Sequence, residues 1–265
     1  MTSSTPDALW GAPSLRVLKP AAVICRDLRR GRDLDHCSLS VPAGARVLLV
    51  SEPDSTASVL VRVLAGLVPL DGGRIRIAGM GDPSARGWGR RVAYLGPNPG
   101  VHAWMTPDEV LHLAAELLDM PTGERDRRIE RVVAWARIPG PARGRPLTRG
   151  GAPLQQRTGL AAAILGDPEV ILFDEPLRAI EAQERARLLR VPGRRRKILV
   201  ASRYPASEEG LATYVVFLRG GRVELIAPMT ELEAAGLPLS HRGIEALAAL
   251  RAAAGGSARH TPRPA

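Results

Sequence analysis

The chain has 265 residues, of which 45% are hydrophobic and only 3% aromatic. Such a chain can form an ordinary globular protein whose core rests on aliphatic side chains. The net charge of +10 comes almost entirely from arginine, because Lys19 and Lys197 are the only lysines. The arginines are scattered and aromatic side chains for base stacking are few, so the composition does not favour nucleic acid as a partner.

The sequence shows no sign of a membrane-spanning or secreted protein. No apolar run reaches the roughly 18 to 20 residues that a membrane helix needs. The N-terminus lacks the basic and then apolar layout of a signal peptide. Cys25 and Cys37 are the only cysteines and do not suggest a disulfide scaffold. We therefore expect a reduced, cytoplasmic chain.

Predicted strands and helices alternate along the chain. Short apolar runs predict strands at 21–28, 37–41, 45–50, 73–79, 90–95, 169–174, 197–202, 213–218 and 222–227. Helical periodicity predicts helices at 58–67, 108–118, 125–136, 156–165, 180–189 and 244–253. This order predicts an α/β fold with a mostly parallel core sheet, and the early strands are expected to form an antiparallel flank.

The predicted domain spans residues 14–254 and carries a helical lobe at about 107–166. That segment is largely helical and too long to be a single crossover connection. Residues 1–13 and 255–265 are small, polar and contain Pro or Gly, so we expect disordered tails there.

The strongest local motif is EVILFDEP, residues 169–176. Its apolar strand ends in Asp174 and Glu175, at the edge where a parallel sheet binds ligands. A carboxylate there can hold Mg²⁺ through water, and a second can orient an attacking water. Two carboxylates that cap a strand-to-helix turn are the alternative, and the motif alone favours that alternative.

Other segments occur in a recognisable order around this motif. VLLVSEPDSTASVLVRVLAGL, residues 47–67, has the strand, turn and helix that frame a phosphate-binding loop. The segments RRVAYLGPNPGVHAW, QQRTGLAAAILGDPEVILFDEP and ILVASRYPASEEGLATYVVFLRGGRVELIAP follow in order. Over about residues 14–235 the chain resembles the ATP-binding subunit of ABC transporters, which is an ABC-type nucleotide-binding domain.

The resemblance implies a P-loop NTPase-like fold and MgATP as the cofactor. It implies membrane-spanning transporter subunits as partners, together with a homodimer or a heterodimer with another nucleotide-binding subunit. It also implies a cytoplasmic position, peripheral at the inner face of the cell membrane through its partner. Substrate choice in this family lies mostly in other subunits, so the sequence does not define the transported substrate.

The phosphate loop, or Walker A motif, departs from the family pattern G-x-x-G-x-G-K-[ST]. The glycine places hold Ser51, Asp54 and Thr56, the lysine place holds Ala57, and Ser58 keeps the place of a Mg²⁺ ligand. No G-K-[ST] exists anywhere in the chain. The family's glycines turn backbone N–H groups toward phosphate and its lysine neutralises charge. We therefore expect this degenerate loop to oppose MgATP binding.

At other motif positions, some residues match the family pattern and others differ from it. Asp174 would hold Mg²⁺ together with Ser58 if nucleotide binds, and Glu175 would be the catalytic carboxylate or its relic. The segment LTRGG resembles the family's signature motif and supplies Thr148, Gly150 and Gly151. Pro97 takes the place of the Q-loop glutamine, and Arg203 takes the place of the switch histidine.

Three functions stay open, and with them the question of whether the chain is an enzyme. The first is a transporter subunit with impaired or absent hydrolysis, a pseudo-ATPase that couples to membrane subunits or regulates an active partner. The second is an active ATPase with an unconventional loop, in which serine and threonine hydroxyls bind phosphate and Arg62 or Arg203 supplies charge. The third is a non-catalytic scaffold or regulator.

Overall fold

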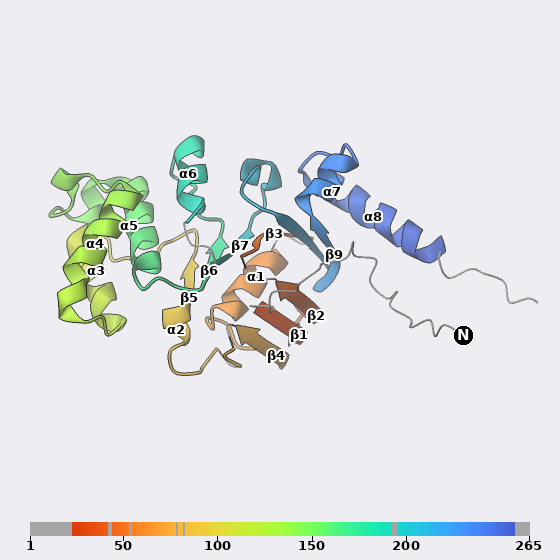
Figure 1. Ribbon diagram of the computed structural model, residues 1–265, viewed down its shortest axis with the longest axis horizontal. Helices are drawn as coiled ribbons and strands as arrows, with labels where there is room; N and C mark the ends of the chain where they lie inside the picture. Colours follow the sequence, from red (N-terminus) through yellow and green to blue (C-terminus); the bar gives the residue numbers. More distant parts are fainter. Residues whose placement is uncertain are drawn as a thin grey trace, which may run out of the picture.

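The computed structural model describes residues 23–41, 44–52, 55–77, 79–81, 83–191 and 196–257. Two sheets, a helical lobe and a long C-terminal helix make up the described part of the chain (Figure 1). The strands are β1 (Val23–Arg30), β2 (Leu34–Val41), β3 (Arg46–Glu52), β4 (Gly72–Ile77), β5 (Val92–Leu95), β6 (Val170–Asp174), β7 (Lys197–Ala201), β8 (Tyr214–Arg219) and β9 (Arg222–Pro228).

The helices complete the described elements. They are α1 (Ser55–Leu64), α2 (Trp88–Arg91), α3 (Pro107–Leu117), α4 (Thr122–Ala136), α5 (Gly151–Leu165), α6 (Ala182–Leu189), α7 (Met229–Ala234) and α8 (His241–Ser257). Short 3₁₀ turns are η1 (Gly140–Ala142), η2 (Leu147–Arg149) and η3 (Pro205–Glu208). Among the described residues, no helix combines the length and the hydrophobicity that crossing a membrane requires.

The sheet topology confirms the predicted fold class. The larger sheet has the strand order β5-β6-β7-β3-β8-β9, and its strands run parallel except for β9, which is antiparallel to β8. The smaller sheet has the order β2-β1-β4 and is antiparallel throughout, as expected for the flank. The carboxyl ends of β3 and β6 therefore point to the same edge of the larger sheet.

The larger sheet is buried on both faces, which explains its continuously apolar strands. In β3, Leu48 and Val50 pack into a core that includes the helical lobe. Val47 and Leu49 pack on the opposite face, in a core shared with α1 and the smaller sheet. Helix α1 thus lies between the two sheets (Figure 1). This sandwiching fixes α1 against the strand ends that carry the predicted site.

Several predicted boundaries are wrong, each for a local reason. Helix α5 begins at Gly151, five residues before the predicted start, because Pro153 is compatible with the first turn of a helix. The predicted strand at 90–95 starts with Arg90 and Arg91, which belong to α2. Helix α8 continues to Ser257, into the predicted tail, since Ala252 to Ala254 are strong helix formers. The other tail residues, 1–13 and 258–265, lie outside the described residues.

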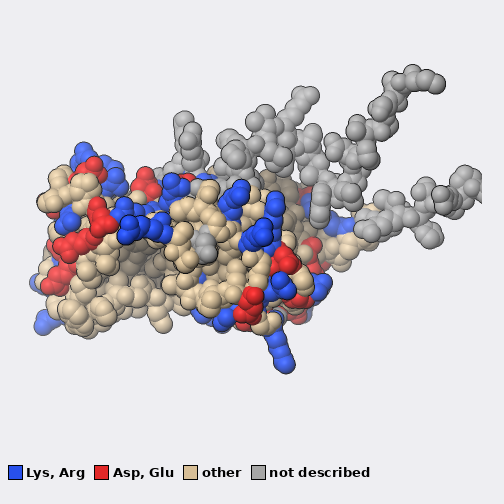
Figure 2. Space-filling model, turned by 90° about the horizontal axis from the view of Figure 1, so that it is seen from below, with Lys and Arg blue, Asp and Glu red and all other residues tan. Residues whose placement is uncertain are grey.

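Charge is mixed over the surface. Figure 2 shows basic and acidic side chains interspersed on the face that it views. Many arginines pair with carboxylates close by in space, and Glu184 of α6 is the most heavily engaged. It accepts hydrogen bonds from Arg187 Nε at 2.8 Å, Arg157 Nη1 at 2.8 Å and Arg137 Nη1 at 3.1 Å. Because Arg137 and Arg157 belong to the lobe, this cluster ties the lobe to α6.

We expect Glu184→Gln to lower the free energy of unfolding at pH 7 by about 1 to 2 kcal/mol, because charge-assisted hydrogen bonds are lost. The hydrogen bonds from Arg187 and Arg157 lower the pKa of Glu184 to about 2, from 4.5. Because the pKa is lower in the folded state, the carboxylate stabilises the fold at pH values above its unfolded-state pKa. That stabilisation is lost as the pH falls from about 4.5 to about 2. Urea unfolding at a series of pH values measures both effects.

The Gln variant should lose less stability than the parent chain across that pH window, since it lacks the titrating carboxylate. Glu233→Gln is the matched control, because Glu233 is exposed and makes no ion pair among the described residues. Parallel pH profiles for the parent chain and Glu184→Gln would contradict the assignment.

Candidate functional site

The carboxylate of Asp174, at the end of β6, is buried and fully engaged. It accepts hydrogen bonds from Ser58 Oγ at 2.6 Å, from Arg62 Nε at 3.0 Å and from the Tyr94 hydroxyl at 3.0 Å. Ser58 and Arg62 lie four residues apart on α1 and therefore share the helix face that looks toward β6. Tyr94 comes from β5, which pairs directly with β6. The predicted partners Ser58 and Asp174 are thus brought together.

Arg62 supplies the positive charge beside Asp174. Its hydrogen bond with Tyr94 and the nearby carboxylate of Asp174 raise the pKa of Arg62, so the guanidinium stays charged. Burial raises the pKa of Tyr94, so the phenol keeps its proton and its hydroxyl donates a hydrogen bond to Asp174. The side chain of Asp174 is 1% exposed, and a permanent cation of the same chain balances its charge.

Glu175 follows in a turn of unusual backbone geometry. Glu175 and Leu177 have φ angles of 49° and 57°, in the left-handed region that side chains rarely adopt. Such positions cost energy and are concentrated at functional sites. The turn places the Glu175 carboxylate, 8% exposed, against the segment that follows β7.

Both oxygens of Glu175 already have donors. Arg178 donates from Nε at 3.0 Å and from Nη2 at 2.7 Å, both to Oε2. The backbone N–H of Arg203 donates to Oε1 at 2.5 Å. The Arg203 guanidinium, at the switch position, lies farther away, with its Nε 3.7 Å from Oε1. The structure therefore gives Arg203 a contact through its backbone, and gives the main charge contact to Arg178.

Arg178 is held in place by several further contacts. Its Nη2 donates to Ser202 Oγ at 2.7 Å and to Glu208 Oε1 at 3.2 Å. Its Nη1 donates to Ser207 Oγ at 3.0 Å, and its guanidinium lies over the ring of Tyr204, 5.2 Å from the ring centroid. A guanidinium with this many partners is fixed in one orientation, with Glu175 on one side and Glu208 on the other.

The phosphate-loop positions lie where β3 meets α1. Ser51 is buried near the end of β3, and its Oγ accepts the N–H of Ala57 at 2.9 Å. That N–H belongs to the first turn of α1, whose free amides are the groups that bind phosphate in a phosphate loop. Thr56 and Ala57 are 1% and 3% exposed, so their side chains are packed inside the protein. Asp54 lies outside the described residues.

The signature-like residues belong to the helical lobe. The N–H of Thr148, in η2, donates to the carbonyl of Ala103 at 2.9 Å. Gly151 opens α5 with a φ of 63°, and a Cβ on Gly150 would meet Leu154 at 2.3 Å. Gly151 is therefore favoured by its backbone conformation and Gly150 by the position of the Leu154 side chain, whether or not the segment contacts nucleotide.

Sequence reasoning missed three residues that shape this site. Tyr94 donates to Asp174, Arg178 pairs with Glu175, and Gln156 accepts the N–H of Ala179 at 2.9 Å. A spacing of three residues, as between Glu175 and Arg178, indicates pairing on a helix, but this segment is a turn, so the sequence did not indicate their pairing. Tyr94 and Gln156 act across the fold, and their sequence positions alone carry no such signal.

Comparisons with known proteins agree with this geometry. The family model described as "ABC transporter" matches residues 34–178, more than half of the chain. The chain belongs to the ABC transporter family. An aliphatic sulfonates import ATP-binding protein of Burkholderia cenocepacia is 30% identical over 230 residues, which are 82% of this chain and 79% of that protein.

Other ABC relatives are longer than this chain. An sn-glycerol-3-phosphate import ATP-binding protein of Rhizobium johnstonii is 30% identical over 74% of this chain, and the match spans 58% of that protein. The chain spans about half the length of several such curated relatives.

Solved ABC structures share the fold. The ATP-binding subunit of an ABC transporter superposes with a TM-score of 0.71 at 21% identity, covering 85% of this chain and 97% of that one. A dimeric ATP-binding cassette in a post-hydrolysis state with ADP and Pi gives a TM-score of 0.68 at 16% identity, covering 78% and 98%. At these identities the likeness shows the fold, and the chemistry must be argued from the residues.

Proposed function

We propose that this chain is the ATP-binding-type subunit of an ABC importer, with weak or absent hydrolysis at its own phosphate-loop site. The observation that carries the proposal is the pairing of both strand-end carboxylates with arginines of the same chain. Asp174 is balanced by Arg62, and Glu175 is balanced by Arg178. The import role is supported by the names of the curated relatives, which are import ATP-binding proteins.

The Asp174 cluster fits Mg²⁺ poorly. A divalent cation needs carboxylate and hydroxyl oxygens that are free to turn lone pairs toward it. Ser58 and Asp174 are the right residue types and lie together, but Arg62 already neutralises the carboxylate. The missing lysine and the Ser51–Ala57 hydrogen bond weaken the phosphate side of the same site. The residues at this site therefore do not fit a bound Mg²⁺ ion.

Glu175 is poorly placed to act on water. A general base needs a free carboxylate lone pair within hydrogen-bond reach of the proton that it removes. The Arg178 guanidinium donates twice to Oε2, and the Arg203 N–H occupies Oε1. An attacking water would compete with three donor N–H groups, two of them on the permanently charged guanidinium of Arg178. This arrangement supports a role in binding and coupling more than a role in turnover.

The helical lobe offers a surface for membrane-spanning subunits. Leu113 and Leu117 are 41% and 77% exposed, and they lie one turn apart on the same face of α3. Leu117 also borders a groove whose other wall contains Arg86 and Arg90. Figure 2 shows a hollow between the lobe and the rest of the molecule. Exposed leucines beside basic groups suit a cytoplasmic segment of a membrane subunit with mixed apolar and acidic character.

The purified chain is expected to hydrolyse MgATP at background rate, because neither strand-end carboxylate is free. A phosphate-release assay measures the rate, and calorimetry measures binding of MgATP to the same sample. Glu175→Gln is the control and should leave the background unchanged. A turnover typical of the family that disappears in Glu175→Gln would overturn the proposal.

An active ATPase is the second candidate, and the position of Arg62 favours it. A guanidinium already lies at the edge of the site, where the family's lysine would otherwise supply charge. Tight MgATP binding that is lost in Asp174→Asn would support this candidate. A chain that binds no nucleotide and associates with no membrane subunit would instead favour a scaffold role.

A further inference from the structure

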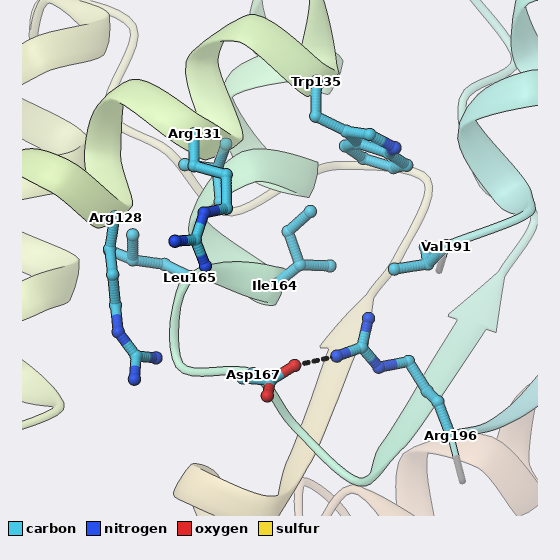
Figure 3. Close-up of a pocket in the computed structure, with 9 residues that line it drawn as sticks. Arg128, Arg131, Trp135, Ile164, Leu165, Asp167, Val191 and Arg196 are labelled. Atoms are coloured by element: carbon cyan, nitrogen blue, oxygen red, sulfur yellow. Dashed lines mark hydrogen bonds and ion pairs between the residues drawn. The ribbon is translucent and has the colours of Figure 1, made fainter. Parts of the chain in front are cut away.

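A cavity of about 290 Å³ lies between the helical lobe and the core, away from the strand-end carboxylates (Figure 3). Its walls come from α4, the end of α5 and the segments that flank β6 and β7. We propose that this cavity binds a small organic anion with a compact apolar body, such as an aryl or branched-alkyl carboxylate or sulfonate. The proposal is independent of whether the chain hydrolyses ATP.

The apolar half of the cavity is preformed. Ile164 and Leu165, at the end of α5, are 9% and 2% exposed, and Val191, which follows α6, is 2% exposed. The indole of Trp135 forms a flat wall beside them (Figure 3). Arg187 packs on Trp135 with its guanidinium 5.7 Å from the ring, which fixes the indole in place. Such a surface suits a ring or a branched chain.

The polar half carries an excess of positive charge. Among the residues that the structure describes, three guanidinium groups line the cavity, from Arg128, Arg131 and Arg196, whereas Asp167 is the only lining carboxylate. Arg196 pairs with Asp167 and also donates from Nε to the carbonyl of Pro168 at 3.0 Å. Arg128 pairs with Glu124 at 3.2 Å, within its own helix. The cavity therefore favours an anion over a neutral molecule or a cation.

Arg131 is the natural anchor for that anion. It lies three residues after Arg128 on α4, so the two side chains extend from one helix face, as Figure 3 shows. Among the described residues, Arg131 makes no hydrogen bond or ion pair. A guanidinium with free donors can bind a carboxylate or sulfonate in a bidentate manner. The apolar surface formed by Trp135 and Ile164, next to Arg131, would receive the apolar body.

The size of the cavity limits what can enter. Its volume lies at the lower end of the range for small-molecule sites, which is roughly 300 to 1,000 Å³. A single ring with a short acidic chain is suitable, whereas a nucleotide is too large and too polar for the apolar wall. A ligand there would contact α4 and α5 of the lobe together with Val191 and Arg196 of the core. Binding should therefore raise the thermal stability of the whole chain.

The test uses 4-phenylbutyrate as the probe and neutral 4-phenylbutanamide as its matched analogue, each titrated into the full chain by calorimetry. We expect the carboxylate to bind and the amide to bind at least about tenfold more weakly, because only the carboxylate pairs with Arg131. Arg131→Gln should weaken carboxylate binding by about tenfold. Binding of 4-phenylbutyrate should also quench the tryptophan emission of the parent chain, and this quenching should be lost in Trp135→Phe.

Arg127→Gln is the control, since Arg127 is exposed on the same helix and does not line the cavity. It should leave the affinity for 4-phenylbutyrate unchanged. Equal binding of the acid and the amide, equal binding by the parent chain and Arg131→Gln, or no binding at millimolar concentration would each overturn the proposal. Because the readout is ligand binding, a failure here would leave the proposed transporter role untouched.

Discussion

Replacing Asp54 with glycine and Ala57 with lysine is expected to raise the affinity of the chain for MgATP by roughly a thousandfold. The double change removes one carboxylate and adds one ammonium group at places where the family holds glycine and lysine. At an effective dielectric constant of about 20, one close charge pair contributes roughly 4 kcal/mol, which corresponds to a factor of about 10³. Calorimetry with MgATP at fixed ionic strength measures the change.

The Ala57 side chain is 3% exposed and packs in the core shared with α1 and the smaller sheet, so a longer side chain there must displace its neighbours, and circular dichroism should first establish that both double variants fold. The N–H of Ala57, and not its side chain, donates to Ser51 Oγ at 2.9 Å. Asp54→Gly with Ala57→Met is the matched control, because methionine is long and flexible but carries no charge. Similar affinities for the lysine and methionine variants would show that charge is not what the loop lacks. The gain in the lysine variant should also shrink as salt is added, since part of it is screened.

Affinity and turnover are expected to separate in this variant. Glu175 stays paired with Arg178 whether or not nucleotide is bound at the loop, so the variant should bind MgATP and still hydrolyse it slowly. Rapid hydrolysis by the variant would mean that the Arg178 contact opens readily. In that case the low rate expected of the parent chain would come from the phosphate loop alone.

The sequence allowed prediction of those parts of the site that depend on regular elements. Asp174 ends a strand of continuous apolar residues, and Ser58 lies in the first turn of a helix that follows another such strand. Parallel neighbours place these two ends at one edge of the sheet, and the hydroxyl and carboxylate meet at 2.6 Å. Periodicity and resemblance therefore indicated two residues that lie together in the fold, and their role in holding Mg²⁺ stays a prediction.

The charges that balance the carboxylates could not be read from the same patterns. Arg178 reaches Glu175 only because the turn after β6 adopts left-handed conformations at Glu175 and Leu177. Residues of those types have no sequence signature for positive φ, unlike glycine. Arg62 was considered as a phosphate ligand, whereas the structure pairs it with Asp174. A helical face shows which residues lie together, but it does not show which carboxylate they meet across the fold.

Arg185→Ala is expected to lower the free energy of unfolding by about 3 to 5 kcal/mol, the usual cost of leaving one partner of a buried ion pair uncompensated. The side chains of Arg185 and Glu208 are 5% and 1% exposed, and they pair directly. Arg185 also donates to the carbonyls of Pro176 at 3.0 Å and Ser207 at 3.2 Å. Urea unfolding monitored by circular dichroism measures the loss.

The loss should come from unpaired charge more than from lost packing, and a double variant separates the two causes. Arg185→Met keeps similar volume but leaves the Glu208 carboxylate without this partner, whereas Arg185→Met with Glu208→Gln also removes the carboxylate charge, so the double variant should be more stable than Arg185→Met. Arg242→Ala, at an exposed arginine without an ion pair among the described residues, should change stability by less than about 0.5 kcal/mol. A double variant as unstable as Arg185→Met would show that the unpaired charge of Glu208 is not the cause of the loss.

The same cluster connects stability to the site. Glu208 pairs with Arg178 as well as with Arg185, and Arg178 holds Glu175. When Arg185 is absent, Arg178 becomes the only described cation left to compensate Glu208, and its hold on Glu175 should weaken. Arg185→Ala should therefore increase solvent exchange at the Arg203 amide, which donates to Glu175, beyond what a uniform loss of stability produces. If the exchange rate of that amide changes only as much as the loss of global stability predicts, the two ion pairs act separately.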